Sequence, residues 1–293
     1  MKKIILLLSL SILFYSVSAE KGDVPTMKTL KDVEETLASF GLSEYREEIS
    51  KLAKGSIHIA LMPESDENIP IGASKMGGMP DLPFGTNWLR HEFDSTPLSF
   101  ICQIDFAEVK PYDKENKLPD HGMLYFFYDC SEKTYWGCAP NDSSDWTVFY
   151  FDGDTSQLAR RPVPDGIIQE GFFFKPARMC FDDALDLPDL YSSEGKTLTL
   201  SDDCRHKYLS LTYKEAPNAN KLLGHSDNIQ FCMEEECEKE TGKTGPWNLL
   251  LQVDSNKDCN MMWGDVGRLY LWITDEDLAA RNFESVWVVM QCN

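Results

Sequence analysis

The sequence predicts an α+β protein in which mainly antiparallel β-sheets form two duplicated halves behind an N-terminal helical hairpin. Three observations lead to this prediction. A β-rich stretch occurs twice, at Lys75–Tyr128 and Lys221–Ile273. Short apolar runs with many β-branched and aromatic residues fill most of the chain, and no alternation of strands with long helices is present. Two stretches with helical periodicity come before the first of these runs.

The two copies of the repeat match in order and in spacing. The first contains KMGGMPDLP, PLSFICQID and GMLYFFY, and the second contains KLLGHSDNIQ, WNLLLQVD and GRLYLWI. The matched pairs are Lys75 and Lys221, Gly78 and Gly224, Asp81 and Asp227, Gln103 and Gln252, Asp105 and Asp254, Gly122 and Gly267, Leu124 and Leu269, and Tyr125 and Tyr270. The repeat predicts an architecture and leaves the function open.

The first residues are typical of a secretory signal peptide. Lys2 and Lys3 precede an apolar run of 11 residues from Ile4 to Phe14, and Val17-Ser18-Ala19 has the small residues of a cleavage site. The run is shorter than the about 20 residues that a transmembrane helix needs. We therefore expect residues 1–19 to be removed, a secreted or periplasmic protein, and no stable membrane insertion after cleavage.

We expect one domain over residues 20–293. Its predicted parts are a helical hairpin at 28–54, a first repeat at about 56–175, a connection at about 176–205 and a second repeat at about 206–293. Thr29 and Asp32 are placed as a capping box for the first helix, and Ser43 begins the second. Strands are expected at 57–62, 98–106, 122–129, 146–151, 166–175, 207–213, 248–254, 267–273 and 285–291, with a short helix capped by Thr274 before the last.

Charge and cysteine content narrow the function classes. The formal net charge of −20 becomes −22 when Lys2 and Lys3 leave with the signal, which excludes a typical nucleic-acid binder.

Export makes disulfides an expectation, and Cys102, inside an apolar strand, is the expected free thiol. Proximity suggests the pairs Cys130–Cys138 and Cys232–Cys237, with Cys180–Cys204 and Cys259–Cys292 for the rest. A zinc site is the alternative, although the chain has no C-x-x-C pair with a partner at the expected spacing.

The predicted ligand-binding residues are polar positions of the repeat and of the loop that follows its second copy. They are Asp81, Gln103, Asp105, Asp227, Gln252, Asp254 and Asp265. In one interpretation they converge in a cleft between the halves. In the other, they only satisfy backbone groups of nearby turns. Asp254, Asn256, Asp258 and Asp265 have calcium-loop spacing, but Cys259 replaces the required glycine and strands flank the loop. We therefore predict neither a metal site nor a cofactor.

The motifs together resemble the YwqG-like proteins, a family filed as a domain of unknown function. The resemblance spans about Ser56 to Cys292 and includes GGMPDLP, MWGDVGRLYLWI and EDLAARNF. It implies a single α+β domain with internal duplication and no established activity. Some relatives lie near toxin–immunity gene clusters, which implies a protein-binding role. This sequence departs from the pattern in its predicted export, its many cysteines, Leu89 where relatives often carry Pro, and Cys102 where a small residue is usual.

The chain contains none of the phosphate-loop, zinc-protease or nucleophile-elbow motifs. Its five histidines are scattered without ligand spacing and are expected to be ordinary surface or core residues. The leading hypothesis is a non-enzymatic binding module with a protein partner. The alternative is a hydrolase with an acidic cleft between the two repeats, and a third hypothesis is a structural envelope protein without a small ligand. Nothing in the sequence fixes the oligomeric state.

Overall fold

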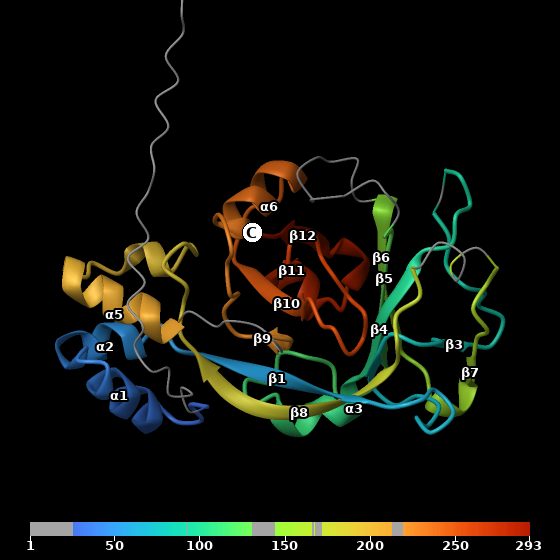
Figure 1. Cartoon of the computed structure of the whole chain (residues 1–293), viewed down its shortest axis with the longest axis horizontal. Helices are drawn as coiled ribbons and strands as arrows, with labels where there is room; N and C mark the ends of the chain where they lie inside the picture. The colour runs from blue at the N-terminus through green and yellow to red at the C-terminus, as the bar shows by residue number, and fades with distance from the viewer. Residues whose placement is uncertain (1–25, 92, 131–143, 166, 168–171, 213–218) are drawn as a thin grey trace, which may run out of the picture.

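The structure, a computed structural model, describes residues 26–91, 93–130, 144–165, 167, 172–212 and 219–293 (Figure 1). The predicted signal peptide and Cys138 lie outside the described residues.

The main sheet of the described structure has ten antiparallel strands. Their order across the sheet is β12-β11-β10-β9-β1-β8-β2-β4-β5-β6. The strands are β1 (Lys54–Pro63), β2 (Lys75–Met76), β4 (Ser99–Asp105), β5 (Met123–Tyr128), β6 (Trp146–Phe151), β8 (Ala177–Asp186), β9 (Lys221–Leu223), β10 (Trp247–Asp254), β11 (Arg268–Thr274) and β12 (Trp287–Gln291). A separate ribbon pairs β3 (Asp81–Pro83) with β7 (Leu158–Arg160).

The sheet has a central pair and two arms. The central pair, β1 and β8, is antiparallel over ten residue pairs. We call β2, β4, β5 and β6 the first arm, and β9, β10, β11 and β12 the second arm. The sheet curls until its edge strands nearly meet, where Trp146 of β6 lies edge-on to Trp287 of β12 with ring centroids 5.1 Å apart. Trp146 Nε1 also donates to the Val286 carbonyl at 3.3 Å.

The curl encloses the largest hydrophobic core. Residues from the central pair and from both arms contribute to it, among them Ile57, Ile104, Phe126, Leu251 and Leu271, all at most 1% exposed. Sheets that pack one face on a core and leave the other partly solvated are typical of antiparallel architecture. The arms are therefore held together through side chains as well as through the central pair.

Helices cover the ends of the sheet rather than alternate with its strands. In Figure 1, α1 (Leu30–Ser39), α2 (Arg46–Ser50) and α5 (Asp202–Thr212) lie together beside one end of the central pair, where they form a second core. The remaining helices with described bounds are α3 (Phe106–Val109), α6 (Met233–Thr241) and α7 (Asp275–Ala279). The 3-10 turns within the described residues include η1 (Ser43–Tyr45), η2 (Lys110–Tyr112), η4 (Thr155–Gln157), η5 (Gly195–Thr197) and η6 (Phe283–Ser285). None of the described helices is long and apolar enough to cross a membrane.

The sequence predicted the main strands and caps of the fold. The strands expected at 98–106, 122–129, 146–151, 248–254, 267–273 and 285–291 are confirmed as β4, β5, β6, β10, β11 and β12. Thr29 and Asp32 form the expected capping box of α1. Thr274 accepts a hydrogen bond from the Asp277 backbone and caps α7. These signals are local, so the surrounding fold did not alter them.

Two expectations about the middle of the chain were wrong. The connection expected at 176–205 contains β8, which is central in the sheet. The acidic residues of β8 made this segment resemble a surface loop in the sequence. In the structure Asp182 is exposed while Ala177 and Met179 are buried, which is the alternation of a half-buried strand. The strand expected at 207–213 is instead helical as far as Thr212, with Cys204, Tyr208 and Leu211 buried at helical spacing.

Smaller differences concern the ends of the predicted elements. The second helix of the predicted hairpin ends at Ser50, and β1 already begins at Lys54. Residues 172–175 form no strand, and positions 166 and 168–171 of that prediction lie outside the described residues.

The predicted disulfides are wrong for the described cysteines. All eight are free thiols, and the pairs Cys180–Cys204, Cys232–Cys237 and Cys259–Cys292 are not formed. Cys232 caps α6 and Cys237 lies five residues along it, about 7.5 Å of axial rise, which is too far for a disulfide. Cys102 is buried and free, as expected.

Candidate functional site

The repeated polar residues of the first arm form a closed hydrogen-bond network. Gln103 Oε1 accepts from the Asp81 backbone at 2.7 Å. Its Nε2 donates to the Ala73 carbonyl and to Asp81 Oδ2, both at 2.9 Å. The Tyr125 hydroxyl donates to the Asp81 carbonyl, and Lys75 Nζ lies 3.9 Å from Asp81 Oδ2. We call Lys75, Asp81, Gln103 and Tyr125 the first network; each is fully buried.

The matching residues of the second arm make the same contacts. Gln252 Oε1 accepts from the Asp227 backbone at 2.9 Å. Its Nε2 donates to the Ala219 carbonyl at 2.5 Å and to Asp227 Oδ2 at 2.8 Å. The Tyr270 hydroxyl donates to the Asp227 carbonyl at 2.6 Å, and Lys221 Nζ lies 3.0 Å from Asp227 Oδ2. We call Lys221, Asp227, Gln252 and Tyr270 the second network.

One further carboxylate joins each network, from the end of β8 or from the segment that follows β1. Asp66, which follows β1, accepts from Lys75 Nζ at 2.8 Å, and Asp186, at the end of β8, accepts from Lys221 Nζ at 2.8 Å. Desolvation lowers the pKa of Lys75, whereas Asp81 and Asp66 raise it. An uncompensated buried charge is very costly, so each ammonium group depends on its carboxylates. The networks therefore clamp the arms to the central pair.

The structure does not gather the two networks in one cleft. Lys75 pairs with Arg178 of β8, and Lys221 pairs with His58 of β1, so β8 and β1 lie between them. Three strand spacings separate the networks across the sheet by about 14 Å. Asp81 and Gln103 thus lie together, and Asp227 and Gln252 lie together, but the four do not meet. This arrangement supports the expectation that they satisfy backbone groups.

The other three predicted site residues also have structural partners or lie apart. Asp105 caps α3 by accepting from the Ala107 backbone at 2.9 Å, and burial raises its pKa. Asp254 is buried and accepts from Arg268 Nε at 3.0 Å. Asp265 lies in an exposed loop. Within the loop that resembles a calcium site, Asn256 Oδ1 accepts from the Cys259 backbone at 3.0 Å, so two of its four expected ligand side chains already have internal partners.

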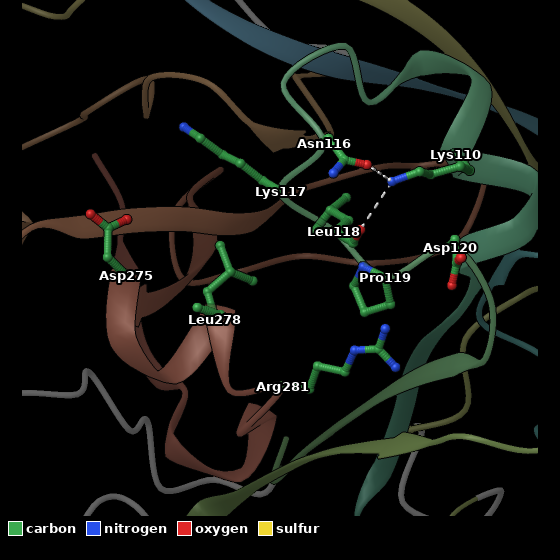
Figure 2. A pocket seen from close by; sticks show the side chains of 10 residues that line it. Lys110, Asn116, Lys117, Leu118, Pro119, Asp120, Asp275, Leu278 and Arg281 are labelled. Atoms are coloured by element: carbon green, nitrogen blue, oxygen red, sulfur yellow. Dashed lines mark hydrogen bonds between the residues drawn. The ribbon is translucent and has the colours of Figure 1, made fainter.

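A groove of about 570 Å³ lies between the arms at a different place (Figure 2). One wall is the loop after η2 in the first arm, and the other is α7 with the turn that follows it in the second arm. The lining residues are Lys110, Asn116, Lys117, Leu118, Pro119, Asp120, Asp275, Leu278, Ala279 and Arg281. Its volume falls within the range of about 300–1,000 Å³ that is typical of ligand pockets.

The loop wall of the groove is held by its own polar contacts. Asp113 accepts from the backbone of Lys117 at 3.1 Å and of Leu118 at 2.8 Å. Lys110 Nζ donates to Asn116 Oδ1 and to the Leu118 carbonyl, as the dashed lines in Figure 2 show. The opposite wall is fixed by the Thr274 cap of α7. A groove with walls ordered in this way needs little rearrangement to bind a ligand.

The groove is apolar at its base and charged at its rim. Leu118 and Leu278 are buried side chains that line it from opposite walls. Lys117 and Arg281 remain partly exposed, with Lys117 Nζ 2.8 Å from Glu115 and Arg281 3.8 Å from Asp152. Lys110 Nζ likewise lies 3.6 Å from Asp113, so each of the three basic lining side chains has a carboxylate within 4 Å. The rim of the groove therefore carries paired charges of both signs, which distinguishes it from the acidic cleft that the sequence suggested.

The groove residues were not predicted from the sequence, because the candidate site residues were selected from the matched polar positions of the repeat and from known motifs. Lys117 and Arg281 are not among the matched positions of the repeat, and Leu278 is indistinguishable from any core residue of an amphipathic helix. Only the curl of the sheet brings the two walls of the groove together.

One group of side chains in the described part of the chain has the composition and spacing to hold a metal ion. It consists of His91, Asp129 and Asp145, whose ligand atoms lie within 4.8 Å of one another. No motif predicted it, because the three residues lie far apart in sequence.

Comparison with known proteins places the chain in a family. The family described as Domain of unknown function (DUF1963) matches residues 74–292. The chain belongs to this family. The matched segment contains both networks and both walls of the groove, whereas α1, α2 and β1 precede it. A search of curated proteins found no match. Since the family description names no activity, function has to be argued from the site.

Proposed function

We propose that this DUF1963 protein is a non-enzymatic binding module that holds a short segment of a partner protein in the groove between the arms. The observation that carries this proposal is the groove itself, with its apolar base, its charged rim and its ordered walls. Apolar pockets with a few polar groups at defined positions are the usual form of binding sites.

The lining residues define the chemistry of the bound segment. Leu118 and Leu278 suit one apolar side chain of the ligand. Lys117 and Arg281 suit an acidic group beside it, because charge complementarity fixes orientation and speeds association. Since the rest of the surface is acidic, a segment with several acidic residues would be repelled outside the groove. The preferred ligand therefore has one acidic and one apolar residue in a short, otherwise neutral or basic segment.

Two adjacent alanines provide a matched test. Ala279 lines the groove and Ala280 does not, although both are exposed at the end of α7. Peptides selected from a random display library on the folded protein would be titrated against Ala279→Trp and Ala280→Trp. We expect Ala279→Trp to weaken binding at least tenfold, because the indole fills the groove, and Ala280→Trp to leave it unchanged. Equal affinity for both variants would place the binding site elsewhere.

Charge reversal tests the rim separately. Arg281→Glu removes a cation from the groove, and Arg205→Glu makes the same change in net charge on the exposed face of α5. We expect only Arg281→Glu to weaken binding of peptides that carry an acidic residue. If both variants weaken binding equally, the attraction is a general field effect and the proposed role of the rim is wrong.

We further propose that the protein is exported after cleavage at Ala19 and that the arms arose by duplication of one YwqG-like unit. The signal-like residues 1–19 support export. The matching contacts of the two networks support duplication. N-terminal sequencing of protein from the cell envelope or medium tests export, and a mature chain that still begins at Met1 would contradict it.

A further inference from the structure

His91, Asp129 and Asp145 converge from two segments at the end of the first arm. Asp129 directly follows β5 and Asp145 directly precedes β6, and the Asp129 backbone donates to the Asp145 carbonyl at 2.7 Å. His91 reaches them from the loop at 90–97, where its backbone donates to the Thr96 carbonyl at 2.8 Å. The two carboxylates and the imidazole are thus positioned by backbone pairing.

We propose that these three side chains bind a divalent transition-metal ion, with zinc as the best fit. Their ligand atoms lie within 4.8 Å of one another, and His91 Nε2 is 3.0 Å from Asp145 Oδ1. Two donors that each lie about 2.1 Å from a tetrahedral zinc ion are about 3.4 Å apart, so the ion requires only a small outward shift of these two atoms. The spacing therefore suits two adjacent ligands of one ion as well as a hydrogen bond.

The surroundings of His91 strengthen this assignment. Its Nδ1 is buried and has no hydrogen bond of good geometry, but it lies 3.3 Å from Asp94 Oδ1. A histidine that binds a metal through one nitrogen commonly directs the other toward a carboxylate, which fixes the ring and raises its basicity. Asp94 is placed for that role while Nε2 lies 3.0 Å from Asp145 Oδ1.

The two carboxylates of the site favour binding of a cation. The Asp145 side chain is 3% exposed, and one of its carboxylate oxygens lies within 4.8 Å of a carboxylate oxygen of Asp129. Two carboxylates in a poorly solvated place repel each other, and a divalent ion relieves that repulsion. One imidazole nitrogen with two carboxylate oxygens favours zinc or manganese over calcium, which prefers oxygen ligands alone. Three protein ligands leave at least one position for water.

The other histidine–aspartate pairs show what this site has in addition. His58 Nε2 lies 3.1 Å from Asp186, but Lys221 occupies the same carboxylate. His121 lies between Asp120 and Asp152, but each acid faces a different ring nitrogen. At His91 the two acids instead come from the facing ends of the paired strands β5 and β6, and one ligand atom from each of the three residues lies within 4.8 Å of the others. His58 and His121 are therefore natural controls.

Calorimetric titration of the folded, chelator-treated protein with zinc chloride tests the proposal, with manganese and calcium chlorides as comparisons. Exposed Cys180 would be replaced by Ser throughout, so that its thiol cannot bind zinc. We expect one zinc ion per chain, and at least a tenfold weaker affinity in His91→Gln, Asp129→Asn and Asp145→Asn. His58→Gln and His121→Gln should bind as the parent does.

The parent and each variant would be checked for folding by thermal melting before titration. Absence of zinc binding by the folded parent would overturn the proposal. So would unchanged affinity in folded His91→Gln, since the bound ion would then lie elsewhere. Tighter binding of calcium than of zinc would overturn the assignment of the ion. None of these outcomes depends on the groove, so the metal site and the proposed binding function are tested separately.

Discussion

Gln103 and Gln252 make the same three hydrogen bonds in the two arms of the sheet. Each side-chain carbonyl accepts from the backbone of an aspartate, and each amide donates to that aspartate and to an alanine carbonyl. Both are fully buried. Each glutamine ties the loop after the short strand, β2 or β9, to the long strand beside it, so the two positions carry the same structural role.

Replacement of either glutamine by leucine should destabilise the fold by a similar amount. Gln103→Leu leaves the Asp81 N–H and the Ala73 carbonyl unpaired, and Gln252→Leu does the same to Asp227 and Ala219. Unpaired buried polar groups cost about 1–3 kcal/mol each, so we expect a loss of about 2–4 kcal/mol for each variant in urea unfolding. Gln157→Leu, which removes one bond at an exposed 3-10 turn, should cost less than about 1 kcal/mol. A neutral effect at either buried position would contradict the shared role.

Comparing Gly78→Ala with Gly85→Ala should distinguish two causes of lost stability. One is the strain of a side chain at positive φ, and the other is a clash of the new Cβ with Asp66, which binds Lys75 of the first network. Both glycines have positive φ, +73° and +87°. A Cβ at Gly78 would lie 2.5 Å from an Asp66 carboxylate oxygen, whereas a Cβ at Gly85 meets nothing within 4 Å. We expect Gly85→Ala to cost about 1–2 kcal/mol from its left-handed backbone alone. Gly78→Ala should cost at least about 2 kcal/mol more in the same unfolding assay, because Asp66 must also move away from Lys75. Equal costs would show that the contact is relieved without loss.

The free energy of unfolding should depend on pH through His225, between the pKa of its imidazole in the folded chain and that in the unfolded chain. Burial, with a contribution from nearby Lys54, lowers its pKa to about 4, although Glu194 lies 3.7 Å away. The neutral ring is favoured in the folded state, so this contribution is complete above about pH 6.5 and is lost as the pH falls toward 4. Between about pH 6.5 and pH 4, the free energy of unfolding should fall by at most about 3 kcal/mol from this residue.

His225→Gln should remove that part of the pH dependence. Its amide can still donate to the Leu52 carbonyl, which accepts from His225 Nε2 at 2.6 Å in the native chain. The difference in unfolding free energy between parent and variant, measured by urea titration from pH 7 to pH 4, should therefore shrink or change sign as the pH falls. His206→Gln, at an exposed position, serves as the control. A parallel pair of curves for parent and His225→Gln would contradict the prediction.

Cysteine labelling should follow burial. Cys180 is exposed on β8, and Cys102 is buried in β4, where desolvation raises its pKa far above its usual range. Since the thiolate is the reactive form, native protein treated with iodoacetamide should be modified at Cys180 and not at Cys102. Peptide mass spectrometry reads both sites, and unfolded protein, in which both react, is the control. A peptide linking Cys180 to Cys204 would instead show the disulfide that the structure lacks.

The sequence by itself determined the strands and caps whose signals are local. Apolar runs such as those of β4 and β11 are buried on both faces in any arrangement of the sheet. A cap such as Thr29 satisfies its own helix end. Of the predicted site residues, Asp81 contacts Gln103 and Asp227 contacts Gln252, because β2 lies beside β4 and β9 lies beside β10, and the chain after each short strand turns back onto the long strand.

Only the tertiary structure decided which segments meet. β8 looks irregular in sequence, because it carries the acids Asp182, Asp183 and Asp186 and because its partner β1 lies more than a hundred residues earlier in the chain. The groove and the group around His91 each join segments that share no motif, and they form because the sheet curls and because β5 pairs with β6. The cysteines also show that tertiary structure decides which residues meet. Their spacing along the chain suggested disulfide pairs, but the described cysteines are free thiols. Local sequence fixes which residues form a strand or a cap, while long-range pairing fixes which side chains share a site.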